Sequence, residues 1–168
     1  MKRLLLERIK KLISNLKNSY FEDINHSKIP SNKFNFVNSD QVIEHVPSDK
    51  KMILEIKRIL KKGGYFKVSS VYKKSWAWYF YRCNGKWVLD PTHIREYTSI
   101  NQFSNLFKIK SIKIEKVYIK KTYFPIADFF LRLLKINRMN KIIYLIRKLK
   151  IRIPGYYHIT VIGVKNEK

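Results

Sequence analysis

The residues best suited to proton chemistry stand in two short segments. Glu44 and His45 are adjacent, just before Pro47. His93 stands four residues before Tyr97, so the two share one face if this segment begins a helical turn. A histidine near its ordinary pKa of about 6.5 can take a proton from a reacting hydroxyl group. The same residues also suit structural roles, as capping or hydrogen-bonding groups at a turn or as half-exposed polar side chains.

Three further polar residues lie where a ligand could be held. Ser39, Asp40 and Gln41 directly follow the run FNFVN, which predicts a strand over 34–38. In open α/β sheets, ligands bind at the carboxyl ends of the strands. The three residues therefore predict a binding edge, although an ordinary loop from strand to helix would use the same residue types.

The elements around these segments form a strand–helix–strand unit. A helix is predicted over 48–60, with a serine as its N-cap and apolar residues at helical spacing. Lys61 and Lys62 are expected in its last turn, and the Gly-Gly pair at 63–64 is expected to close it. A second strand is predicted over 65–71. Short links of this kind indicate a parallel strand pair with a right-handed crossover.

The rest of the chain is predicted to extend the same domain. Strands are expected over 19–24, 110–120 and 156–164, and helices over 3–16, 98–107, 126–136 and 139–149. Pro154-Gly155 is expected to separate the last helix from the last strand. The prediction is one domain over 1–168, with an aromatic, lid-like insertion over 72–98 and basic amphipathic helices over 126–150.

Composition limits the class of protein. The chain has 168 residues, 45% of them hydrophobic, which is enough for a packed core and too many for a disordered chain. Cys83 is the single cysteine, so neither an intrachain disulfide nor a zinc site built on several cysteines can form. Apolar runs are far shorter than a membrane span, and a cytoplasmic protein is expected. The net charge of +24 indicates either an anionic partner or a lysine-rich coding bias.

Three segments together resemble a known family. They are FNFVNSDQVIEHVP at 34–47, EIKRILKKGGYFKVSS at 55–70 and DPTHIREYT at 90–98. In order and spacing they resemble the second part of class I S-adenosylmethionine-dependent methyltransferases of types 11 and 12. Lys62 stands where that family usually has proline, and Asn35 where it has aspartate. The resemblance implies an α/β fold, an incomplete Rossmann-like sheet of parallel strands with an antiparallel pair, 110–120 and 156–164, at its C-terminal edge, lacking the first βαβ unit.

The resemblance also implies a reaction and its residues. The reaction is methyl transfer from S-adenosylmethionine to an oxygen or nitrogen of a small molecule, a glycan or a lipid-linked acceptor. The implied catalytic residues are Glu44, His45 and His93. The implied cofactor-binding residues are Asp23, Ser39, Asp40 and Gln41. The implied substrate-binding residues are Trp76, Trp78 and Tyr97, from an aromatic stretch that could equally be the core of a lid.

No metal is expected from the sequence. In the ubiquinone-type O-methyltransferases, a glutamate three residues before the Glu-His pair joins it to bind a divalent metal. Gln41 stands at that position here, and without the carboxylate a hard-cation site is not expected.

The cofactor's glycine-rich turn is missing from the sequence. Glycines occur only at 63, 64, 85, 155 and 163, and none forms G-x-G. Such glycines let the backbone approach the ligand closely. We therefore expect the chain alone to bind S-adenosylmethionine weakly or not at all. A truncated gene, a wrong start codon or a split enzyme with an upstream-encoded N-terminal half would each explain the pattern.

A non-catalytic basic module is the competing hypothesis. Residues 129–165 contain nine lysines and arginines and no acid, on stretches with apolar stripes. A cationic face beside an apolar face is typical of helices that lie on an anionic membrane surface. Nucleic acid is a less favoured partner, because no RNP-like or other nucleic-acid motif is present.

Overall fold

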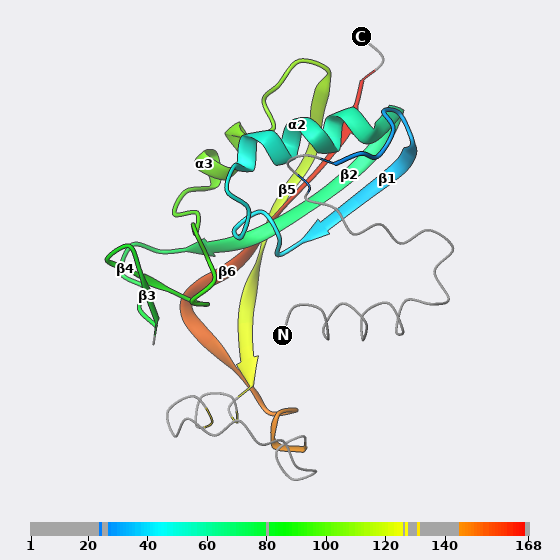
Figure 1. The fold of residues 1–168 in the computed structure, drawn as a ribbon. Helices are drawn as coiled ribbons and strands as arrows, with labels where there is room; N and C mark the ends of the chain where they lie inside the picture. The colour runs from blue at the N-terminus through cyan, green and yellow to red at the C-terminus, as the bar shows by residue number, and fades with distance from the viewer. Residues whose placement is uncertain are drawn as a thin grey trace.

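A computed structural model describes residues 24, 27–79, 81–125, 127, 131 and 145–166 (Figure 1). Its helices are α2 (Asp49–Ile59) and α3 (Ile100–Asn105), and its strands are β1 (Phe34–Asp40), β2 (Leu60–Lys73), β3 (Tyr81–Cys83), β4 (Lys86–Val88), β5 (Ile112–Pro125) and β6 (Lys150–Lys165). Four predicted elements lie wholly or almost wholly outside the described residues: 3–16, 19–24, 126–136 and most of 139–149. Within the described part, no helix is long and apolar enough to cross a bilayer.

The main sheet has the strand order β1-β2-β6-β5. β1 and β2 are parallel, whereas β6 runs antiparallel to both of its neighbours, β2 and β5. The predicted parallel unit and the predicted antiparallel pair are therefore confirmed. Figure 1 shows α2 lying over β1 and β2, on the side of the sheet where α3 also lies. β3 and β4 form a separate two-stranded hairpin.

The helix α2 begins where the sequence predicts it. The Ser48 side chain accepts a hydrogen bond from the Lys51 amide at 3.2 Å, which is the N-cap interaction. The helix ends one residue early, however, because Leu60 is already extended and pairs with Phe34. Lys61, Lys62 and the Gly-Gly pair therefore belong to β2, not to the end of the helix. The left-handed φ of +72° at Gly63 accompanies the register shift between β1 and β2.

One hydrophobic core joins the helices to the sheet. Met52, Ile53 and Ile56 of α2 face the inner side chains of β2 and β6. Phe66 of β2 stacks on Phe107 at 5.4 Å between ring centroids, next to α3. α3 ends at Asn105, shorter than predicted. This core places the carboxyl end of β1 and the start of α2 at a fixed position on the sheet.

Two features of the second half differ from the sequence prediction. β6 begins at Lys150 and continues through Pro154-Gly155, so this pair bends a strand and does not precede it. Gly155 has a φ of +76°, which permits the bend. The hairpin β3–β4 is not indicated by periodicity. Its turn is Asn84-Gly85, with φ values of 50° and +73°, the residue pair favoured in two-residue hairpins.

Candidate functional site

The segment after β1 is held by one arginine. The Arg95 guanidinium donates hydrogen bonds to the carbonyl oxygens of Ile43 at 3.0 Å, Val46 at 2.6 Å and Pro47 at 2.7 Å. It also lies 3.9 Å from the Asp49 carboxylate at the start of α2. Three carbonyls converging on one cation fix the backbone of the turn, because charge-assisted hydrogen bonds are strong and directional.

Glu44 lies at the centre of this turn and is fully buried. The amides of Ile94 and Arg95 donate to its carbonyl oxygen, which ties the turn to the segment 90–97. Its carboxyl Oε2 accepts a hydrogen bond from the Ser70 hydroxyl at 2.9 Å, whereas Oε1 is buried without a hydrogen-bond partner. Burial raises the pKa of the Glu44 carboxyl, and the hydrogen bonds and nearby histidines oppose this only in part.

The hydrogen bonds of His45 determine its tautomer. Nδ1 lies 3.2 Å from the carbonyl oxygen of Thr92 and 3.1 Å from its hydroxyl. A carbonyl oxygen can only accept, so Nδ1 carries the proton, and neutral His45 has its lone pair on Nε2. The Thr92 hydroxyl donates to Asp90 at 2.6 Å. Burial raises the pKa of Asp90, but the hydrogen bonds from Thr92 outweigh it and the net shift is downward.

His93 is buried and paired with a carboxylate. Its Nδ1 lies 2.6 Å from Oε1 of Glu96, whose side chain is only 2% exposed. The same oxygen accepts a hydrogen bond from the Leu89 amide at 2.7 Å. A carboxylate partner holds the proton on Nδ1, so the lone pair of His93 is also on Nε2. The rings of His45 and His93 are 4.8 Å apart, edge to face at 65°.

We call Glu44, His45 and His93 the histidine cluster. One ligand atom from each lies within 4.8 Å of the others. The cluster brings together three residues that the sequence predicts as catalytic, from two segments almost 50 positions apart. The two imidazole rings and the carboxyl group lie close together just after the end of β1, an arrangement that can accept a proton or hold a cation.

The predicted cofactor residues lie at the same edge. Ser39 and Asp40 belong to the end of β1, and Gln41 follows with a φ of 55°. The Ser69 hydroxyl donates to the Asp40 carboxylate, and the Gln41 side-chain amide lies 3.5 Å from the same hydroxyl. The Ser39 hydroxyl is buried without a hydrogen-bond partner. Asp23 lies outside the described residues.

The three predicted substrate residues are not brought together. Tyr97 is buried in the core, where its hydroxyl donates to Asp49 at 3.2 Å and its ring packs on Phe103. The condition for His93 and Tyr97 to share a helical face is not met: the segment turns at 90–93, and Tyr97 then forms a parallel bridge with Tyr72. His93 consequently pairs with Glu96, not with Tyr97.

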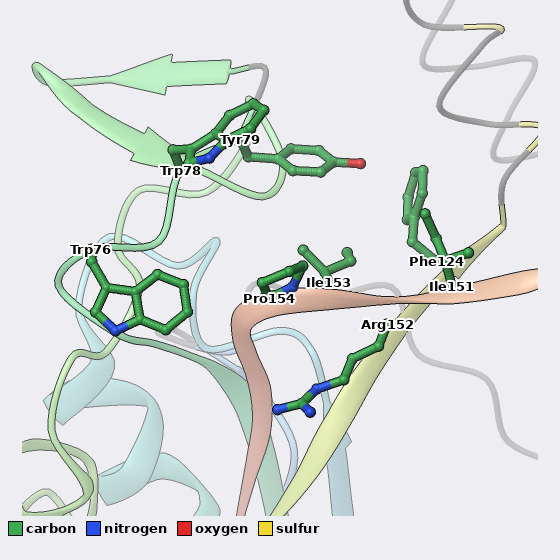
Figure 2. A pocket seen from close by; sticks show the side chains of 8 residues that line it. All are labelled: Trp76, Trp78, Tyr79, Phe124, Ile151, Arg152, Ile153 and Pro154. Atoms are coloured by element: carbon green, nitrogen blue, oxygen red, sulfur yellow. The ribbon is translucent and has the colours of Figure 1, made fainter.

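Trp76 and Trp78 line a separate apolar pocket of about 190 Å³ (Figure 2). We call it the tryptophan pocket. Its other lining residues are Tyr79, Phe124, Ile151, Arg152, Ile153 and Pro154. Ser70, which binds Glu44, pairs with Ile159 of β6, and Ile153 lies six residues before Ile159 on that strand. The pocket and the histidine cluster are therefore separate sites with no residue in common.

Four supporting residues were not predicted from the sequence: Ser70, Thr92, Arg95 and Glu96. Glu96 had a local signal, since it follows His93 by three residues within a short polar segment. Thr92 had a weaker one, as the second residue after Asp90 in a turn. Ser70 and Arg95 act on residues far away in the sequence, so no local pattern points to them.

Comparisons with known proteins identify the family and the fold of this chain. The sequence pattern of a methyltransferase-domain family matches residues 6–130. The chain therefore belongs to that family, the class I S-adenosylmethionine-dependent methyltransferases. The resemblance to this family is confirmed, as is the α/β fold with parallel and antiparallel strands. A search of curated proteins finds no match.

Solved structures show the same fold at low sequence identity. A candidate methyltransferase from Bacillus halodurans has a TM-score of 0.64 and 14% identity, covering 96% of this chain and 78% of its own. YcgJ from Bacillus subtilis has a TM-score of 0.60 and 15% identity, covering 96% and 77%. Phosphoethanolamine N-methyltransferase 2 from Haemonchus contortus, in complex with S-adenosyl-L-methionine, has a TM-score of 0.55 and 13% identity, covering 94% and 40%.

Proposed function

We propose that this chain transfers a methyl group from S-adenosylmethionine to a hydroxyl or amine of an acceptor, and that the acceptor reacts at the histidine cluster. The observation that carries the proposal is that two imidazole rings lie 4.8 Å apart beside the carboxyl end of β1, each with its Nδ1 engaged by an acceptor. Ligands of open α/β sheets bind at that end. Methyl transfer to a hydroxyl needs a group that removes its proton, and Nε2 of either histidine can accept it.

The reaction is an in-line displacement. The bond between the methyl carbon and the sulfonium sulfur breaks, and its electron pair stays on sulfur. A new bond forms from the acceptor oxygen to the methyl carbon, and the acceptor proton passes to Nε2 of a histidine. His93 suits the proton better than His45, because the Glu96 carboxylate stabilises the imidazolium that forms. Holding the two substrates in line supplies much of the rate.

Ser39, Asp40 and Gln41 are the proposed cofactor contacts of the described residues. Ser39 and Asp40 end β1 and Gln41 follows it, just before the histidine cluster, and the Ser39 hydroxyl has no partner among the described residues to lose. No glycine occurs in residues 1–62, so close approach of the backbone to the ribose and methionine parts lacks its usual residue type. We therefore expect weak binding by this chain alone. Because the donor is a metabolite of the cell interior, we place the reaction in the cytoplasm.

The tryptophan pocket suggests the acceptor class. Trp76 and Trp78 are 64% and 62% exposed, on an apolar surface with Arg152 beside it. The pocket is apolar and separate from the polar cluster, so an amphiphile could place its polar head at the cluster and its apolar tail in the pocket. We propose a lipid-linked acceptor, met at an anionic membrane surface that the strongly cationic chain would favour.

The decisive experiment is methyl transfer from labelled S-adenosylmethionine to a panel of hydroxylated acceptors, with and without a lipid tail. The variant is His93→Gln, and the matched control is His158→Gln, a histidine of β6. We expect His93→Gln to lower the rate at least a hundredfold and His158→Gln to leave it unchanged. Equal rates in the two variants would remove the histidine cluster from the reaction.

The acceptor proposal has its own readout. Replacing both Trp76 and Trp78 by alanine should raise KM for a lipid-linked acceptor and leave KM for a short water-soluble one unchanged. An equal change in both KM values would mean that the pocket supports the fold and does not bind the tail.

A further inference from the structure

We propose that Glu44, His45 and His93 bind one divalent transition-metal ion. The inference goes beyond methyl transfer and does not depend on it, since metal binding is measured without cofactor or acceptor. The sequence argues against a hard cation, because Gln41 replaces a carboxylate. The structure supplies a different third ligand, His93, from a segment that the sequence does not place beside Glu44.

Each of the three residues offers a ligand atom that the protein leaves unused. Nδ1 of both histidines is engaged by an acceptor, so both lone pairs sit on Nε2. Oε1 of Glu44 is buried and has no hydrogen-bond partner among the described residues. A buried oxygen without a partner is costly, and fully buried polar groups usually have one. A bound cation would pair this oxygen and both lone pairs at once.

The groups behind the three ligands form the outer layer that metal sites require. A histidine that binds a metal almost always donates its other ring N–H to a carboxylate or carbonyl. His93 donates to Glu96 and His45 donates to the Thr92 carbonyl. The other carboxyl oxygen of Glu44 is bound by Ser70. This layer is independent of the proximity of the ligands and fixes the orientation of each of them.

The spacing is that of a site before the ion enters. Transition-metal bonds to nitrogen and oxygen are about 2.0–2.2 Å long, so tetrahedral ligand atoms lie about 3.5 Å apart. The largest separation here is 4.8 Å. Closing the difference requires a shift of about an ångström, which the exposed ring of His45 can make while Glu44 and His93 stay buried.

The donor set selects the kind of metal. Two imidazoles and one carboxylate suit zinc, iron, cobalt or nickel, whereas magnesium and calcium favour oxygen ligands alone. Three protein ligands leave coordination positions open. The ligand expected there is a hydroxyl oxygen, whose pKa a metal ion lowers. In the loaded protein the ion, not a free imidazole, would then promote loss of the acceptor proton.

The test is titration of the chelator-stripped chain with Co²⁺, followed by absorption, and displacement by Zn²⁺ in calorimetry. We expect one equivalent to bind with micromolar affinity or better. His93→Gln, His45→Gln and Glu44→Gln should each weaken binding at least a hundredfold, and Glu96→Gln ten- to a hundredfold. His158→Gln should leave binding unchanged. Circular dichroism establishes that each variant is folded.

A measurement on the unaltered chain avoids any folding defect. Paramagnetic Co²⁺ should give the ring protons of His45 and His93 the large contact shifts of metal ligands in nuclear magnetic resonance spectra, whereas His158, which is not a ligand, should show only a smaller through-space shift. No absorption change with Co²⁺, or binding that survives in the His45 and His93 variants, overturns the inference. Because no cofactor is added, a chain that binds Co²⁺ but never transfers methyl groups would lose only the proposed function.

Discussion

The histidine cluster and the tryptophan pocket are built in opposite ways. Around the cluster, polar groups set the geometry: Arg95 binds three carbonyls, and Glu96 and Thr92 each hold one imidazole. The pocket is made of aromatic and aliphatic side chains around the bend of β6 at Gly155. This chain therefore uses directional hydrogen bonds where the orientation of a ring nitrogen matters, and side-chain packing where only an apolar surface is needed.

Substituting Gly155 should damage the pocket most. A Cβ at this position would lie 2.6 Å from Cβ of Ala77 and 3.0 Å from the Trp76 ring, on a backbone with a φ of +76°. Overpacking and left-handed strain together should cost Gly155→Ala about 3 kcal/mol. Gly63→Ala is the control, with a φ of +72° but nothing within 4 Å, and should cost about 1 kcal/mol. Urea unfolding measures both, and equal losses would show that strain alone matters at Gly155.

Removing the Arg95 side chain should destabilise the turn that holds the histidine cluster. Arg95→Ala leaves the carbonyls of Ile43, Val46 and Pro47 without their shared donor. We expect a loss of about 2 kcal/mol of unfolding free energy, since hydrogen bonds to charged groups are worth more than neutral ones. Arg152→Ala, on the exposed rim of the pocket, should change stability by less than about 0.5 kcal/mol. If the two arginines prove equivalent, the contrast between the regions is wrong.

Two buried hydroxyl groups differ in whether they form a hydrogen bond. Ser70 donates to Glu44, so Ser70→Ala strips a buried carboxyl of its side-chain donor and should cost about 1–2 kcal/mol. The Thr122 hydroxyl is also buried but has no hydrogen-bond partner. Thr122→Val should therefore be neutral or stabilising. Thermal unfolding measures the stability of both variants. A stabilised Ser70→Ala variant would mean that the hydrogen bond to Glu44 contributes little.

The smallest effect is expected at His158, on β6 between the two regions. Burial lowers the pKa of this histidine, and Asp40 raises it only in part. The unfolded chain therefore takes up a proton near pH 6.5 before the folded chain does. The stability that neutral His158 contributes to the folded chain is complete above about pH 7 and declines as the pH falls through 6.5. His158→Gln should flatten that part of the stability curve, and an unchanged slope would contradict the assignment.

The sequence predicts the local elements of the cluster region well and its supporting contacts poorly. The run FNFVN and the serine before 49–59 carry enough local information to locate β1 and α2. Glu44, His45 and His93 were singled out by residue type and resemblance. Their meeting depends on Arg95 and on the bridge between Tyr72 and Tyr97, which are long-range contacts.

The pocket region was predicted less well, for physical reasons. Pro154-Gly155 normally indicates a break, but the left-handed φ of Gly155 lets β6 bend and continue. Trp76 and Trp78 were grouped with Tyr97 because all three are aromatic. Only the packing of the sheet shows that Tyr97 is buried in the core and that the tryptophans line a separate pocket.

The most direct test of the account is the tautomer of each histidine ring. The chain has four histidines, so long-range ¹⁵N–¹H spectra of the ring nitrogens, recorded where the rings are neutral, resolve each one. We expect His45 and His93 to carry their proton on Nδ1 and to leave Nε2 as an acceptor. Glu96→Gln should move the His93 signals and leave those of His45 in place. Protons on Nε2 of both rings would contradict the central claim, because neither histidine could then take a proton or bind an ion within the cluster.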